Sequence, residues 1–382
     1  MTPPRPIRIM IVDDSAVMRG LLRSVISSSS GLEVASTATD GASAIQLVQT
    51  ERPDLILLDV EMPVKDGLAT LRELRARGHK MPIIMCSSLT QRGAKVTIEA
   101  LAIGASDYVA KPTGQTSREA AMRKLSQELI PKINALTSQL RQQSTSATAS
   151  SLFFAKQAPP PPGTQIPTVA PSIVAIGVST GGPAALDVVL PALPANFPLP
   201  IVIVQHMPEV FTKLFAERMN SRCKLHVAEA SEGAPVVPGT IYIARGNWHM
   251  EVMASMRPGA PNTLHLNQDS PENHCRPAVD VLFRSVAKLY GGAVLAVILT
   301  GMGSDGLIGC RPIREQGGTV LAQDQATSTV WGMPGAVTQA GLAHRVLPLN
   351  AIALDMIRTV GRSTPTSTTG NQLRNPDRVM VS

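Results

Sequence analysis

Short apolar runs alternate with amphipathic stretches along the first 136 residues. Five runs have the length and composition of buried strands: IRIMIV (7–12), LEVAS (32–36), DLILLD (54–59), MPIIMCS (81–87) and SDYVA (106–110). Helical patterns follow them, beginning near Ser15, Gly41, Asp66 and Arg92, with a final helix that ends near Leu136. Strands that alternate with helices favour a parallel sheet covered on both faces. We therefore expect a doubly wound α/β domain over residues 1–136.

The same alternation returns later in the chain. The runs IVAIGV (173–178), PLPIVIV (198–204) and AVLAVILT (293–300) are mostly branched and apolar, with helical patterns between them. This predicts a second doubly wound α/β domain with a mainly parallel sheet over residues 173–362.

Between the two domains the periodic apolar residues stop. Residues 137–172 include QQSTSATASS and APPPPGTQIPTVAP, which are rich in Ser, Thr and Pro. Such a composition predicts a linker that is partly flexible and partly polyproline II. Phe153 and Phe154 are unusual in a spacer and would be able to dock on a neighbouring surface. Residues 363–382 are expected to form a disordered tail.

The composition fits two folded domains better than a nucleic-acid-binding chain. The 382 residues are 44% hydrophobic and 16% charged, which suffices for buried cores. A net charge of +7 could attract phosphate backbones, but the basic residues are dispersed and aromatics make up only 3%, too few for base stacking. We expect no nucleic acid partner, and take the charge as weak evidence for an acidic protein partner.

The cysteines and the apolar stretches indicate a reducing, aqueous compartment. No C-x-x-C pair occurs among Cys86, Cys223, Cys275 and Cys310, which disfavours both a zinc site and a disulfide framework. The longest apolar stretch, AVLAVILTGMG, is well short of the roughly 20 residues of a membrane span. The opening run MTPPRPIRIMIVDD reaches two aspartates too soon for a secretion signal. We therefore expect a cytoplasmic protein that is not embedded in a membrane.

Polar side chains follow the strands of the first predicted domain. Asp13 and Asp14 come after the first strand, Asp59 ends the third, Ser87 ends the fourth and Lys111 follows the fifth. Three carboxylates in one crevice need a hard divalent cation such as Mg²⁺, and an aspartate beside it can attack a phosphoryl group. Asp13 and Asp14 alone could simply cap a helix, but the full set at four strand ends is not explained by capping.

The stretches IVDDS, LLDVEMPVKDGL, MCSSLT and GASDYVAKP resemble the receiver domain of bacterial response regulators over residues 7–135. The resemblance implies a flavodoxin-like (βα)5 fold whose phosphoryl group comes from a histidine kinase. It also implies roles for single residues: Asp59 as phosphorylation site, Asp13, Asp14, Asp59 and the Glu61 carbonyl as Mg²⁺ ligands, Ser87 and Lys111 as phosphate readers, and Tyr108 as aromatic switch.

The second predicted domain also carries reactive groups after its strands. Ser179 lies in a G-x-S-x-G pattern after the first strand, His206 follows the second, and Asp305 lies in a Gly-rich loop after the third. A serine hydroxyl becomes nucleophilic when a histidine takes its proton and a carboxylate orients that histidine. A dinucleotide-binding loop is disfavoured, because no G-x-G-x-x-G is present and the second strand ends in Gln205-His206 rather than in an acid.

Other residues compete for the same roles. His274 lies just before a helix that begins near Pro277, and it remains a second candidate for the base. Asp280 and Asp324 compete with Asp305 for the acid. Asp280 falls in the helical pattern VDVLFRSVA, where a first-turn residue that responds to the helix dipole is the simpler interpretation.

The stretches GVSTGGPAAL, VIVQHMP, RPAVDVLFRSVA, LTGMGSDG and STVWGMPG resemble the catalytic domain of the chemotaxis methylesterases, from about residue 173 to 349. The resemblance implies that Ser179 is the nucleophile, His206 the general base and then acid, and Asp305 its orienting carboxylate. The Met302 amide, with amides after Ser179, would bind the oxyanion, and Thr180 would line the site. Cys275 departs from the family pattern, and we expect it to affect packing rather than chemistry.

The resemblance further implies a function. These enzymes hydrolyse glutamyl methyl esters on cytoplasmic helices of chemoreceptors, often with deamidation of receptor glutamines, and the esterase step needs no cofactor. A receiver packed over the Ser179 edge would exclude the receptor, and phosphorylation would uncover it. The alternative is a receiver-controlled scaffold or binding protein of a signalling pathway other than chemotaxis.

Overall fold

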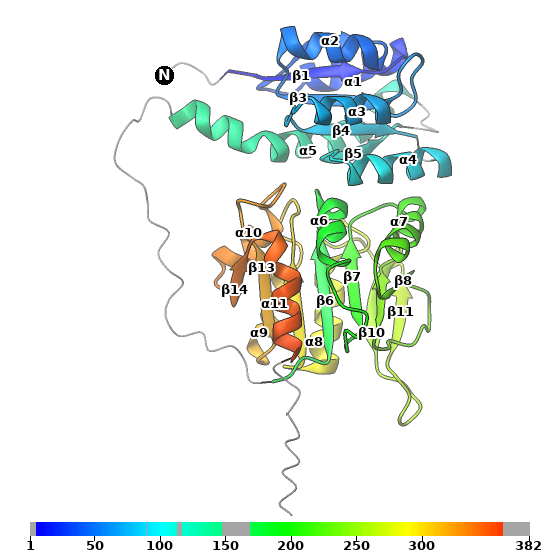
Figure 1. The fold of residues 1–382 in the computed structure, drawn as a ribbon, viewed down its shortest axis with the longest axis vertical. Coiled ribbons are helices and arrows are strands. Elements are labelled where there is room, and N and C mark those ends of the chain that lie inside the picture. The colour runs from blue at the N-terminus through cyan, green and yellow to red at the C-terminus, as the bar shows by residue number, and fades with distance from the viewer. Residues whose placement is uncertain (1–4, 89, 113–116, 147–168, 362–382) are drawn as a thin grey trace, which may run out of the picture.

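The computed structural model describes residues 5–88, 90–112, 117–146 and 169–361, with the side chains of 139–146 left out. These residues form two α/β units, one stacked on the other (Figure 1). Their sheets are separate, and the strands within each main sheet run parallel. The predicted fold class is therefore confirmed for both units.

The first unit is a five-stranded sheet in the order β2-β1-β3-β4-β5. Its strands are β1 (Ile7–Val12), β2 (Leu32–Ala38), β3 (Leu55–Asp59), β4 (Ile83–Ser87) and β5 (Asp107–Ala110). Its helices are α1 (Ala16–Ser27), α2 (Gly41–Glu51), α3 (Gly67–Ala76), α4 (Gln91–Ala102) and α5 (Arg118–Ser146). The central strands are buried on both faces, which explains why their sequences are continuous apolar runs.

Helix α5 is longer than its sequence pattern predicted. It runs to Ser146, past the boundary at residue 136 where the linker was expected to begin. Residues 137–146 lack apolar periodicity, yet Gln, Leu and Arg extend an existing helix readily because no new nucleus has to form. The rest of the predicted linker up to residue 168, with Phe153 and Phe154, and the predicted tail lie outside the described residues.

The second unit is a seven-stranded sheet in the order β14-β13-β12-β6-β7-β9-β8, beside a two-stranded antiparallel hairpin. The sheet contains β6 (Ile173–Val178), β7 (Ile201–Gln205), β8 (His226–Glu229), β9 (Thr240–Ile243), β12 (Val294–Ile298), β13 (Thr319–Gln323) and β14 (Arg345–Leu347). The hairpin pairs β10 (His249–Met253) with β11 (Thr263–Asn267).

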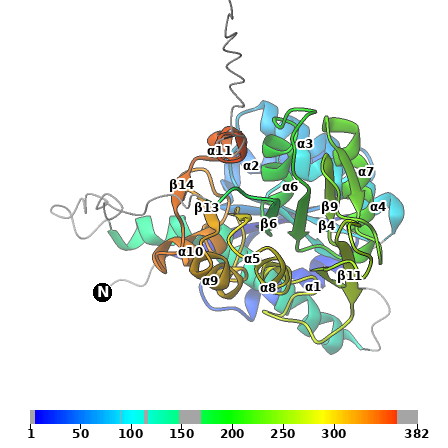
Figure 2. The same cartoon turned by 90° about the horizontal axis from the view of Figure 1, so that it is seen from below.

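Helices cover both faces of this second sheet (Figure 2). Their bounds are α6 (Gly182–Val189), α7 (Glu209–Arg222), α8 (Val279–Tyr290), α9 (Leu307–Glu315), α10 (Met333–Gln339) and α11 (Leu349–Gly361). Alternate residues of β6 point to opposite cores: Val174 and Ile176 join the cluster with α6, α7 and α11, whereas Ile173 and Ala175 join the one with α8, α9 and α10.

The two units touch where α4 and β5 face α6 and α7 (Figure 1). The ring of Tyr108 in β5 stacks on that of Phe211 in α7, with centroids 4.6 Å apart and an interplanar angle of 21°. Beside this stack, the Thr180 hydroxyl donates a hydrogen bond of 2.8 Å to Asp107 Oδ2. Thr180 lies two residues before the first residue of α6. In the described part of the chain, no helix is long and apolar enough to cross a membrane.

Candidate active site

Ser179 lies in a sharp turn between β6 and α6. Its amide donates to the Thr300 carbonyl at 3.0 Å, and its own carbonyl accepts from the Gly182 amide at 2.8 Å. The turn requires glycine at position 181, where φ is 77° and a Cβ atom would lie 2.4 Å from Thr329 Oγ1. The chain therefore reverses immediately after Ser179 and leaves this residue partly exposed at the edge of the sheet.

The loop after β12 approaches Ser179 from the neighbouring strand. A Cβ atom on Gly301 would lie 2.9 Å from the Ser179 Cβ, so the serine packs against bare backbone. Met302 follows, with 38% of its surface exposed. Among the described residues, none accepts a hydrogen bond from the amide of Met302 or of Thr180. Of these two residues, Met302 is exposed and Thr180 is buried.

His206 follows β7, the strand next to β6. Its amide donates to the Val178 carbonyl at 3.2 Å. The Gln205 side chain adds a second link, because its Nε2 donates to the carbonyls of Ser179 at 3.0 Å and of His206 at 3.2 Å. In the sequence, Gln205 stands out only as the end of a strand that carries no acid. Its role as a bridge depends on two adjacent strands and leaves no periodic trace in the sequence.

Asp305 is the carboxylate that contacts His206. Its Oδ2 lies 2.8 Å from His206 Nε2, and only 2% of the residue is exposed. The carboxylate also accepts amide hydrogen bonds from Val279 at 2.7 Å, Asp280 at 2.9 Å and Gly306 at 3.0 Å. Two of these amides open α8, so Asp305 serves as a cap from another loop, where Ala278 has no side-chain acceptor. Burial opposes its charge, but His206 and these amides outweigh burial and lower the pKa of Asp305.

The other imidazole nitrogen faces a cysteine. Cys275 Sγ lies 3.6 Å from His206 Nδ1, so this cysteine contacts the proposed base, and the expectation that it affects packing rather than chemistry stays a prediction. Burial alone would lower the pKa of His206, but the hydrogen bonds to Asp305 and Cys275 outweigh it and raise the pKa to about 9. No hydrogen bond joins Ser179 to His206 in the part of the chain that the structure describes.

None of the rival candidates contacts the His206 ring among the hydrogen bonds of the described residues. Asp280 is buried in the first turn of α8, where it accepts from the Gly309 amide and from Asn273 Nδ2 at 3.0 Å. His274 is exposed with a φ of 61°. Asp324 accepts from the amide and hydroxyl of Thr327. Of the acids proposed for the second unit, the structure brings Asp305 to His206.

A second polar group lies at the carboxyl edge of the first sheet. One carboxylate oxygen each from Asp13, Asp14 and Asp59 lies within 4.8 Å of the others. Lys111 Nζ is 2.9 Å from Asp13 Oδ2 and 2.7 Å from Asp59 Oδ2. Glu61 has an exposed side chain that lies 3.5 Å from Arg92 Nε. Three close carboxylates provide hard oxygen ligands, so this donor set fits Mg²⁺.

The environment of Asp59 shows how unfavourable its charge is in this crevice. Burial, together with the Asp13 charge, outweighs the hydrogen bond and charge of Lys111 and raises the pKa of Asp59 to about 6. Burial would lower the pKa of Lys111, but its bonds to Asp59 and Asp13 outweigh burial and raise it. Ser87 is buried nearby and donates to the Ser88 carbonyl at 3.1 Å. The crevice therefore holds excess negative charge that a cation would relieve.

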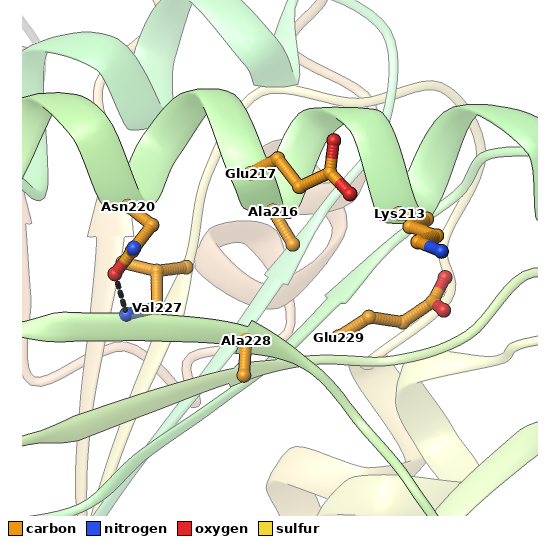
Figure 3. Close-up of a pocket in the computed structure, with 7 residues that line it drawn as sticks. All are labelled: Lys213, Ala216, Glu217, Asn220, Val227, Ala228 and Glu229. Atoms are coloured by element: carbon orange, nitrogen blue, oxygen red, sulfur yellow. Dashed lines mark hydrogen bonds between the residues drawn. The ribbon is translucent and has the colours of Figure 1, made fainter. Parts of the chain in front are cut away.

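A hollow of about 310 Å³ lies between α7 and β8 (Figure 3). Its lining consists of Lys213, Ala216, Glu217, Asn220, Val227, Ala228 and Glu229. The Asn220 side chain accepts from the Val227 amide at 2.9 Å, and so ties the two elements together. None of the predicted site residues lines this hollow, so we do not assign the chemistry to it.

Comparison with known proteins gives consistent matches over both units. Residues 174–356 match the family model of the CheB methylesterase, and residues 9–123 match that of the response regulator receiver domain. A protein-glutamate methylesterase/protein-glutamine glutaminase of Trichodesmium erythraeum is 49% identical over 93% of this chain and 99% of its own length. A protein of the same name in Nocardioides is 46% identical over 94% of this chain and 97% of its own length. The crystal structure of the Thermotoga maritima CheB methylesterase catalytic domain is 45% identical, with a TM-score of 0.48 over 50% of this chain and 99% of that one.

Proposed function

This chain belongs to the family of protein-glutamate methylesterases/protein-glutamine glutaminases with a receiver domain, and we propose that it demethylates glutamyl methyl esters on cytoplasmic helices of chemoreceptors. The observation that carries the proposal is the His206–Asp305 pair, 2.8 Å apart, on the strand end beside the Ser179 turn. Such receptors would place the enzyme in the cytoplasm and in chemosensory adaptation. Glutamines on the same helices are a second substrate, because they differ from the ester only in the leaving group.

The chemistry follows from the two sides of the His206 ring. Asp305 accepts the Nε2 proton, so Nδ1 is the nitrogen that can take the proton of Ser179. The Ser179 oxygen then attacks the γ-carbonyl carbon of the ester. Asp305 stabilises the imidazolium that forms, and the free amides at Met302 and Thr180 stabilise the negative oxygen of the tetrahedral intermediate.

The intermediate collapses when the protonated His206 gives its proton to the leaving group. Methanol leaves from an ester and ammonia from a glutamine, and both leave a glutamyl ester on Ser179. A water molecule, deprotonated by the same nitrogen, then attacks this ester and releases glutamate. The proposed esterase step requires no cofactor.

The first unit supplies the control. Asp13, Asp14 and Asp59, with the Glu61 carbonyl, would hold Mg²⁺, which offsets the negative charge of the crevice and of an incoming phosphoryl group. A histidine kinase would donate that group to Asp59, and Lys111 and Ser87 would bind its oxygens. Tyr108 stacks on Phe211 of α7, and Asp107 accepts the hydrogen bond of Thr180. Movement of Tyr108 toward the phosphorylated site would therefore loosen the contact by which the first unit covers Ser179.

Release of methanol from methylated receptors tests this function against the scaffold alternative. Receptors with radiolabelled methyl groups are incubated with the full-length chain, a small phosphodonor and Mg²⁺, and volatile label is counted. The proposal predicts release by the wild type and none by Ser179→Ala, the matched control. If the wild type, even when phosphorylated, released no more label than Ser179→Ala, the proposed esterase function would fail and the scaffold function would be favoured.

A further inference from the structure

A tight turn just before α8 carries two side chains onto the acid–base pair. Glu272 and Cys275 exchange backbone hydrogen bonds of 2.9 and 3.1 Å, and φ is 53° at Asn273 and 61° at His274. Positive φ at both central residues is the geometry of a type I′ turn, in which Asn is well tolerated. The backbone of this turn therefore fixes the directions of the side chains at 273 and 275.

Contacts on both sides hold the turn in place. Glu272 receives both guanidinium branches of Arg284 from α8, at 2.7 and 2.6 Å. On the other side, the Asn247 amide donates to the Arg276 carbonyl at 3.0 Å. A paired bidentate contact and a backbone bond on opposite flanks leave the turn little freedom to shift.

The two side chains of the turn reach different members of the pair. Asn273 Nδ2 donates to Asp305 Oδ1 at 2.9 Å and to Asp280 Oδ2 at 3.0 Å, so one amide joins two buried carboxylates. Cys275 Sγ contacts His206 Nδ1 at 3.6 Å. Because Asp305 holds Nε2, this is the nitrogen that must receive the serine proton in the proposed reaction.

We propose that Cys275 is a positioning residue of the esterase reaction, whose thiol holds the Nδ1 side of the His206 ring until the Ser179 hydroxyl takes that place. The inference rests on the proposed function. A thiol is a weak hydrogen-bonding group, so it can orient the ring and still yield to a hydroxyl. A stronger group at this position would compete with Ser179 for the same nitrogen.

The groups that act on the ring come from three elements. Asp305 contacts the ring from the loop after β12, and Cys275 contacts it from the turn. Asp280 of α8 interacts electrostatically with Asp305. Glu272 interacts with Asp305 but is neutralised by Arg284. Since Asp305 and Cys275 both favour the protonated ring, loss of the thiol alone should lower the pKa of His206 and leave the Asp305 contact intact.

Three variants of the full-length chain test the proposal: Cys275→Ala, Cys275→Ser, and Cys223→Ala as a control that removes a half-buried cysteine at the end of α7. We expect Cys275→Ala to lower kcat for methanol release about fivefold with KM unchanged, since the substrate contacts remain. Cys275→Ser should restore the orientation but slow the reaction through competition for Nδ1. Cys223→Ala should match the wild type.

NMR titration of the His206 ring supplies a readout that needs no substrate. The midpoint should fall in Cys275→Ala and stay unchanged in Cys223→Ala. An unchanged midpoint and kcat in Cys275→Ala, in a chain whose wild type releases methanol, would overturn the role of Cys275 and leave the proposed function standing. If the wild type released no methanol, the proposed function would fail, and the titration would still decide whether the thiol acts on the ring.

Discussion

In both units the reactive side chains follow the carboxyl ends of parallel strands, but the charges gathered there differ. The first unit brings together three carboxylates and a single lysine, and burial raises the pKa of Asp59. In the second, the Asp305 carboxylate is matched by three amides, one asparagine and His206. One crevice is electrostatically incomplete without a cation and a phosphoryl group, whereas the other is already compensated. The first arrangement therefore suits a site that gains a cation and a phosphoryl group, and the second suits a site whose charges are already paired.

The largest effect on the rate should come from changes to the proposed catalytic triad of Ser179, His206 and Asp305. Ser179→Ala should reduce methanol release by about 10⁴-fold or more, with a similar loss in His206→Ala and a somewhat smaller one in Asp305→Asn, because these groups act as a unit. Steady-state release from labelled receptors measures each rate. If Asp280→Asn or His274→Ala, in a folded chain, lost more activity than Asp305→Asn or His206→Ala, our assignment of acid or base would be wrong.

The pH profile should follow His206. With a pKa of about 9, only about one ring in a hundred is neutral at pH 7, and a protonated ring cannot accept the serine proton. The rate should therefore rise roughly fiftyfold between pH 7 and pH 9, as the proton leaves. Initial rates over this range, corrected with Ser179→Ala for alkaline ester hydrolysis, give the profile. A flat profile would mean that the base titrates well below neutral pH.

A smaller effect should come from the contact between the units. Asp107→Ala removes the acceptor of the Thr180 hydroxyl and of Lys132 Nζ, and it leaves Ser179, His206 and Asp305 unchanged. A hydrogen bond to a charged group is worth about 1.5–3 kcal/mol, so the basal rate should rise about tenfold or more while the phosphorylated rate changes little. Gln49→Ala, an exposed change on α2, is the control. Equal basal rates in Asp107→Ala and Gln49→Ala would show that the hydrogen bond from Thr180 to Asp107 does not keep the first unit over Ser179.

The sequence predicted the features that depend on one element at a time. Continuous apolar runs identified β3, β4, β6, β7 and β12, and a run interrupted only by Arg8 identified β1, because strands buried on both faces carry few polar positions. It missed the extension of α5, since a polar helix that continues from a packed one carries no apolar period. The short edge strand β14, with Val346 40% exposed, has no such run either.

The same limit applies to the site. Ser179, His206 and Asp305 could be proposed together because the carboxyl ends of adjacent parallel strands meet at one edge. Gln205, Asn273 and Cys275 could not, because their contacts depend on which strands are neighbours and on a turn with two left-handed residues. Among these, only the odd cysteine beside Arg276 stood out in the sequence, and its position beside the base was not anticipated.

We propose that the first unit covers the Ser179 edge and that phosphorylation of Asp59 uncovers it. The direct test is methanol release by the full-length chain with and without a phosphodonor, in the wild type and in Asp59→Ala. If the covered state is favoured by about 2 kcal/mol, the open fraction is a few per cent, so the donor should stimulate the wild type by at most roughly thirtyfold. Asp59→Ala should stay at the basal rate with or without donor. Equal stimulation of Asp59→Ala and wild type would contradict the claim.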